Sequence, residues 1–111
     1  MADFKPDESE FDRVLSSPKE GPREAGRLLA SMYVREMPLE DFKELSKSSQ
    51  IPPEVHEWLS NKGIPKSQLK QVRNGFKSRI GELLDSLERS SSWEGFTGMS
   101  EEQRWEQIRA G

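Results

Sequence analysis

Six basic side chains and no acidic ones lie between residues 59 and 81 of this 111-residue chain. They are Lys62, Lys66, Lys70, Arg73, Lys77 and Arg79. The formal net charge of the chain is -3, so this local charge of +6 leaves -9 for the remaining residues. Such segregation produces a directional electric field, which selects partners and accelerates encounters. The segment is the strongest candidate binding feature of the sequence.

The residue types that catalysis and metal binding require do not form a recognisable pattern. His56 is the single histidine, and His56-Glu57 begins like a metalloprotease motif in which Ser60 takes the place of the second histidine. The chain has no cysteine, which excludes disulfides and thiolate metal sites. It also lacks a phosphate-binding loop and a nucleophile elbow. We therefore expect a non-enzymatic protein with no catalytic residues, no cofactor and no metal ion.

Four of the basic residues have helical spacing. Lys66, Lys70, Arg73 and Lys77 follow one another at intervals of four, three and four, which places them along one side of a helix. Like charges at these intervals repel one another and form no stabilising ion pairs within the helix. Compensation would come from acidic stretches of the same chain such as residues 40–41, from an acidic protein partner, or from nucleic-acid phosphate. The sequence leaves these three interpretations open.

Helices are the elements that must position these side chains. Proline, glycine and serine divide the chain into about six helical stretches, and strand patterns are nearly absent. The longest stretch, residues 66–88, is predicted to be one amphipathic helix of about six turns. Its apolar stripe would be buried in the core, or would pair with a second copy or a partner. The stripe consists of Leu69, Val72, Phe76, Ile80, Leu83, Leu84 and Leu87.

The predicted fold class is all-α, a compact bundle of five to six helices with a short C-terminal amphipathic helix. Residues 1–6 are expected to be a flexible N-terminus, residues 7–88 a helical domain, and residues 89–111 a serine-rich break followed by the C-terminal helix. Apolar runs are too short to span a bilayer, and the N-terminus lacks the apolar region of a secretion signal. We expect a cytoplasmic protein without membrane association, with homodimerisation as an open alternative.

Aromatic residues are concentrated in the last 19 residues of the chain. Trp93, Phe96 and Trp105 would each bury about 150–250 Å² when packed. The tail therefore either folds back onto the body or anchors a partner, since interfaces favour tryptophan and phenylalanine. Together with the six basic residues, these three predict a small regulatory or adaptor protein that binds an acidic protein surface.

The segment from Gly63 to Gly75, with the sequence GIPKSQLKQVRNG, resembles the turn and recognition helix of Cro/repressor-type helix-turn-helix proteins. The residues at matching places are Gly63, Ile64, Ser67, Leu69, Val72, Asn74 and Gly75. The resemblance implies, as the alternative function, a DNA-binding transcriptional regulator with a helix-turn-helix at residues 53–75. It further implies base-edge contacts from Lys66, Ser67, Gln68 and Gln71 and phosphate contacts from Lys70 and Arg73. A helix that ends at Asn74-Gly75 favours DNA, whereas an unbroken helix to Glu88 favours a protein partner.

Overall fold

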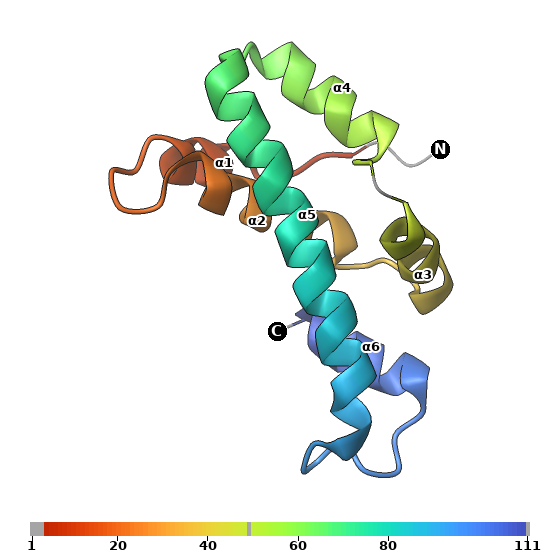
Figure 1. Ribbon diagram of the computed structural model, residues 1–111. Helices are drawn as coiled ribbons and strands as arrows, with labels where there is room; N and C mark the ends of the chain where they lie inside the picture. The colour runs from red at the N-terminus through yellow and green to blue at the C-terminus, as the bar shows by residue number, and fades with distance from the viewer. Residues whose placement is uncertain (1–3, 49, 111) are drawn as a thin grey trace.

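The computed structural model describes residues 4–48 and 50–110 (Figure 1). The described residues form six α-helices and one 3-10 turn, with no strand among them. The elements are α1 (Glu8–Leu15), α2 (Gly21–Val34), α3 (Leu39–Lys47), α4 (Pro53–Lys62), α5 (Lys66–Arg89), η1 (Ser90–Ser92) and α6 (Glu101–Ala110). The predicted all-α fold class is confirmed, and α5 begins at residue 66 as predicted from the sequence.

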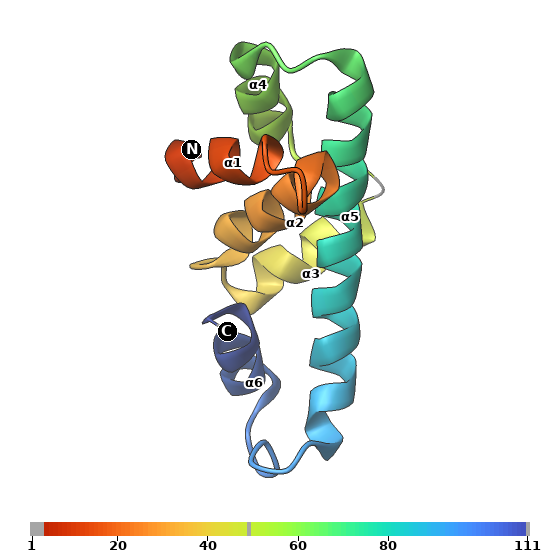
Figure 2. The ribbon, with the colours of Figure 1, turned by 90° about the vertical axis from the view of Figure 1, so that its left-hand side faces the viewer.

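Helix α5 runs along one side of the molecule, and the other five α-helices pack mainly against one face of it, to its left in Figure 2. Its 24 residues span most of a molecule that measures 46 × 33 × 23 Å. One face of α5 therefore contributes to the core along its whole length, while the other face is directed to solvent. This arrangement leaves much of the polar side of α5 exposed, including Lys66, Lys70 and Lys77.

Helix α5 passes through Asn74-Gly75 without a break, because Gly75 is required for packing rather than for a turn. A Cβ atom at Gly75 would lie 1.9 Å from the carbonyl oxygen of Arg23 on α2. Reciprocally, a Cβ atom at Gly26 of α2 would lie 1.9 Å from the carbonyl oxygen of Val72. The two glycines allow the backbones of α2 and α5 to touch where the helices cross. The sequence indicated a weak point here, and the structure shows a close helix crossing instead.

A single hydrophobic cluster draws on all six α-helices. Its fully buried members include Phe11 from α1, Leu29 from α2, Phe42 from α3 and Phe76 from α5. Of the predicted apolar stripe, Val72, Phe76, Ile80, Leu83 and Leu87 are buried, whereas Leu69 and Leu84 are half-buried. Most of the stripe is thus used within the chain's own core.

The C-terminal tail folds back onto the body. Trp105 on α6 is 1% exposed, stacks on Phe42 with ring centroids 4.0 Å apart, and donates its Nε1 hydrogen to the carbonyl oxygen of Met37 at 2.7 Å. Ser100 and Gln103 form a capping box at the start of α6, with backbone-to-side-chain hydrogen bonds of 3.0 and 3.2 Å. Helix α6 is therefore part of the same core as the other helices.

The described part of the N-terminal segment is packed as well. Phe4, which we expected to lie in a flexible end, contacts Tyr33 and Trp58 edge-to-face at centroid distances of 5.3 and 6.1 Å. The ring of Phe4 thus packs against both α2 and α4. The part of the expected flexible N-terminus that comprises residues 1–3 lies outside the described residues.

Candidate functional site: the cationic row of α5

Four basic residues of α5 form what we call the cationic row: Lys66, Lys70, Arg73 and Lys77. Lys66, Lys70 and Lys77 are exposed, and Arg73 is half-buried. Within residues 4–48 and 50–110, none of the four has a carboxylate oxygen within 4.0 Å of its charged nitrogens. The acidic stretches of the described chain therefore do not neutralise the row by direct pairing.

Lys62 and Arg79, predicted with the row as partner-binding residues, are instead paired inside the fold. The ammonium of Lys62 lies 2.7 Å from Asp12 and 2.7 Å from Glu8, and its side chain is only 16% exposed. Hydrogen bonds to Asp12 and then to Glu8 hold the pKa of Lys62 above its ordinary value. Arg79 contacts Ser31 at 3.1 Å and Glu82 at 3.3 Å. These two cations fasten α4 to α1 and α5 to α2, so we remove them from the candidate site.

The charge at the start of α5 is the reverse of that at the start of every other described α-helix. The first turns of α1, α2, α3, α4 and α6 each carry at least one acidic residue. The first turn of α5 has none, carries Lys66, and receives no side-chain cap from Pro65. Anions stabilise a helix N-terminus and cations destabilise it, because the helix dipole is positive there. The sequence therefore places cations at this position at the expense of helix stability.

Arg73 links the cationic row to α4. Its Nη2 atom lies 3.0 Å from Nδ1 of the exposed His56. Its Nε atom is buried and has no hydrogen-bond partner. Buried donors in native proteins are nearly always satisfied, so the guanidinium of Arg73 is under-satisfied in the free chain. Such a group gains more from an incoming acceptor than one already paired with a carboxylate.

Two adjoining hollows lie beside the row. One of about 410 Å³ is lined by Gln50, Ile51, Pro53, His56, Arg73 and Lys77. The second, of about 180 Å³, is lined by Leu45, Ser46, Ser48, Gln50, Phe76, Lys77, Ile80, Gly81 and Leu84. Gln50 and Lys77 border both, so the hollows form one groove between α5 and the region that joins α3 to α4. We call this the α5 groove; its first part is basic and its second part is largely apolar.

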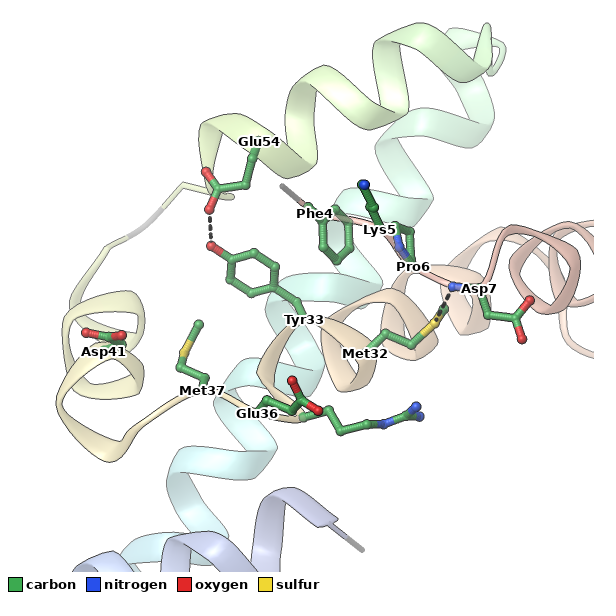
Figure 3. Close-up of a pocket in the computed structure, with 11 residues that line it drawn as sticks. Phe4, Lys5, Pro6, Asp7, Met32, Tyr33, Glu36, Met37, Asp41 and Glu54 are labelled. Atoms are coloured by element: carbon green, nitrogen blue, oxygen red, sulfur yellow. Dashed lines mark hydrogen bonds between the residues drawn. The ribbon is translucent and has the colours of Figure 1, made fainter. Parts of the chain in front are cut away.

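A third hollow, of about 520 Å³, lies on another side of the molecule, between the N-terminal segment and the ends of α2, α3 and α4 (Figure 3). Its walls mix Lys5 and Arg35 with four acidic residues. Tyr33 donates a hydrogen bond to Glu54 across one side of it. Burial, and next this hydrogen bond, raise the pKa of Tyr33 above its ordinary value. The mixed charge of the lining does not single out one kind of ligand.

The comparisons with known proteins leave the geometry as the basis for function. No protein-family model, curated protein or solved structure matches the chain. Within the described residues, no helix has the length and apolar character needed to cross a membrane, and no three or more His, Asp or Glu side chains are grouped to hold a metal ion.

The aromatic residues predicted as anchors divide into two groups. Trp105 is a core residue, because Phe42 and the Met37 carbonyl already occupy its ring face and its indole N–H; its prediction as a partner contact is wrong. Trp93 is 37% exposed and forms an edge-to-face pair with the half-buried Phe96 at 5.5 Å. Trp93 and Phe96 follow α5 at the end opposite to the cationic row.

The residues implied by the helix-turn-helix resemblance occupy the first two turns of α5. Gly63 adopts the left-handed conformation at φ 69° and joins α4 to α5. Lys66, Ser67, Lys70 and Gln71 are exposed, whereas Gln68 and Arg73 are half-buried. The helix continues for another 14 residues beyond Gly75. By the criterion set from the sequence, this continuity favours a protein partner.

Sequence reasoning missed the α5 groove. Its walls come from α5 and from residues 45–48, 50–53 and 56, which lie at least 17 positions from the α5 residues that line it. The available signal was Leu84, which lies seven residues after Lys77 and thus continues the cationic row on the same side of the helix. An apolar residue in line with a row of cations indicates a mixed contact surface.

Proposed function

We propose that this chain is a cytoplasmic, non-enzymatic adaptor or regulatory protein that binds an acidic surface of another protein through the cationic row of α5. The observation that carries the proposal is the absence of any carboxylate near these four cations among the described residues, although most other basic residues of the helices are paired. Unpaired, aligned charges steer encounters and select partners of opposite charge.

The energetic cost of the row supports a role outside the fold. Lys66 and Lys70 are four residues apart, and like charges at this spacing destabilise a helix by about 0.2–0.5 kcal/mol. Lys66 also opposes the helix dipole, and the Nε of Arg73 is buried without a partner. Local departures from the most stable arrangement are typical of binding sites. The repulsion between Lys66 and Lys70 and the unfavourable place of Lys66 at the helix N-terminus would both be reduced when an acidic partner docks.

Trp93 and Phe96 supply a second candidate contact of the same interface. Trp93 is exposed and Phe96 is half-buried, and aromatic residues of these types are enriched in protein interfaces. Both follow the C-terminal end of α5, so a partner that spans the helix would contact the cationic row at one end and this aromatic pair at the other. A partner that contacts only one end of α5 would use the cationic row alone.

Affinity capture with charge-reversed variants tests the proposal. The full chain carrying Lys66→Glu, Lys70→Glu and Lys77→Glu is compared with wild type by quantitative mass spectrometry of nuclease-treated extract. The half-buried Arg73 is left in place to protect the fold. We expect the proteins enriched by wild type to be depleted at least about tenfold with the variant, because three opposed charges replace three attractive ones.

A control with the same change in net charge separates the site from general electrostatics. Lys19→Glu, Arg35→Glu and Lys47→Glu reverse three exposed cations outside the row. This control should retain the partners of wild type. Identical capture by wild type and the row variant would refute the proposal.

A DNA-binding regulator is the second candidate function, favoured by the left-handed Gly63 turn and by the exposure of four of the six implied contact residues. It requires affinity for duplex DNA that falls steeply with salt. Fluorescence anisotropy with a random duplex at about 50 mM salt measures this directly. Binding that is lost in the row variant would favour DNA, and no binding at tens of micromolar protein would remove this candidate.

A further inference from the structure

The α5 groove changes character along its length. Lys77 and Arg73, with His56 opposite, line its first part, and Leu45, Ile80 and Leu84 line its second part. No acidic side chain lines either part among the described residues. An occupant must therefore present negative charge to the first part and apolar side chains to the second.

Gly81 keeps the second part of the groove open. A glycine in a helix interior makes the helix less stable than an alanine would. At Gly75 the packing explains the glycine, because the backbone of α2 leaves no room for a side chain there. Gly81 has no such reason among the residues that the structure describes, because a Cβ atom there would meet none of their atoms within 4 Å. Any larger side chain at this position would occupy the space over Ile80 and Leu84.

The dimensions of the groove limit what fits. Residues 73 and 84 are eleven positions apart on α5, which corresponds to about 16 Å along the helix axis. An extended segment covers that distance in about five residues. The groove thus suits a short linear segment of a partner rather than a whole folded domain.

We infer that the α5 groove binds a short acidic segment of a partner protein in which carboxylates are followed, within about five residues, by aliphatic side chains. The carboxylates contact Arg73 and Lys77, and the aliphatic side chains lie over Gly81 against Ile80 and Leu84. The inference rests on the proposed function and extends it, because the cationic row alone would accept any acidic surface whereas the groove selects a sequence pattern.

Fluorescence anisotropy with three labelled ten-residue peptides tests the inference on the full chain. The first peptide has three acidic residues followed by two leucines; the second replaces the leucines by serine; the third replaces the acids by their amides. We expect the first peptide to bind at least about tenfold more tightly than either control, because each control loses one of the two contacts.

Two bulky substitutions on α5 form a matched pair. Gly81→Trp places a ring in open space within the groove, and Gln71→Trp places the same ring on an exposed position outside it. Gly81→Trp should lower the affinity for the acidic-leucine peptide at least about tenfold. Gln71→Trp should leave that affinity within about twofold of the wild-type value. Amide chemical shifts of ¹⁵N-labelled wild-type protein give a readout without any variant, with the largest changes expected from residue 73 to residue 84.

The outcomes separate this inference from the proposed function. If the serine peptide binds as tightly as the leucine peptide and Gly81→Trp has no effect, the groove inference is overturned while docking on the cationic row stands. If the amide peptide binds as tightly as the acidic one, the groove is apolar only and the inference is again overturned. Failure of all three peptides to bind overturns the inference, whereas the proposed function is judged by the capture experiment.

Discussion

Gly75 and Gly81 both lie in the interior of α5, but replacing them by alanine is expected to have opposite effects on stability. Gly75→Ala would force a methyl group onto the Arg23 carbonyl, and such overpacking typically costs about 1–3 kcal/mol. Gly81→Ala should raise the free energy of unfolding by about 0.8–1.0 kcal/mol, since the added methyl meets no atom and favours the helix. Urea unfolding of the two variants checks both signs, and a stabilised Gly75→Ala would contradict the described crossing.

Tyr33 provides a titration that reports on the packing between α2 and α4. Burial and the hydrogen bond to Glu54 raise its pKa, so the folded state keeps the phenol protonated after an unfolded chain would have lost the proton. The free energy of unfolding should therefore be unaffected below about pH 10 and should fall as the pH rises above it. Tyr33→Phe should reduce this fall, and the raised pKa of Lys62 accounts for part of what remains.

The measurement is direct because Tyr33 is the only tyrosine in the chain. Ultraviolet absorbance of the tyrosinate gives its midpoint in the folded protein. We expect a midpoint above the value in urea-unfolded protein, and coincidence of the two would contradict the described environment.

Helix α5 carries Lys66 in its first turn, where an acidic residue would make the helix more stable. Lys66→Glu would place an acid in the first turn and remove the repulsion with Lys70. We expect the free energy of unfolding to rise by about 0.3–1 kcal/mol, measured by urea unfolding at low salt. The same substitution should weaken partner capture, and a loss of stability would show that Lys66 supports the fold rather than binding.

Helix α6 is expected to stabilise the whole fold through one side chain. Trp105→Ala removes the stack on Phe42 and the hydrogen bond to Met37, and large-to-small changes at buried tryptophans cost about 3–5 kcal/mol. Trp93→Ala is the matched control, because the exposed ring should change stability by less than about 0.5 kcal/mol. Equal effects of the two substitutions in chemical unfolding would be inconsistent with a docked α6.

At the level of the whole molecule, periodicity and caps predicted the elements but not their contacts. The helix from residue 66 and the Ser100–Gln103 cap follow from local spacing, and both are present. The pairing of Lys62 with Glu8, 54 positions away, depends on how α1 packs on α4. No local pattern contains that information, so the sequence could not separate Lys62 from the row.

The same reasoning accounts for Trp105 and for the groove. An aromatic residue in a short amphipathic helix packs equally well on its own chain or on a partner, and only the position of Phe42 decides between them. The α5 groove arises because residues 45–48 and 50–53 lie beside α5, which is a property of the assembled chain. Sequence patterns therefore located the charged side of the site, and the fold supplied its apolar side.

Lysine footprinting tests the central proposal most directly, namely that the cationic row is a docking surface for an acidic protein partner. The full chain is treated with a low concentration of an acetylating reagent in buffer and in nuclease-treated cell extract. The reactivity of each lysine is then measured by mass spectrometry. We predict that Lys66, Lys70 and Lys77 become several-fold less reactive in extract, while the exposed Lys19 and Lys47 change little. Equal reactivity of the row in buffer and extract, or equal protection of all five lysines, would contradict the proposal.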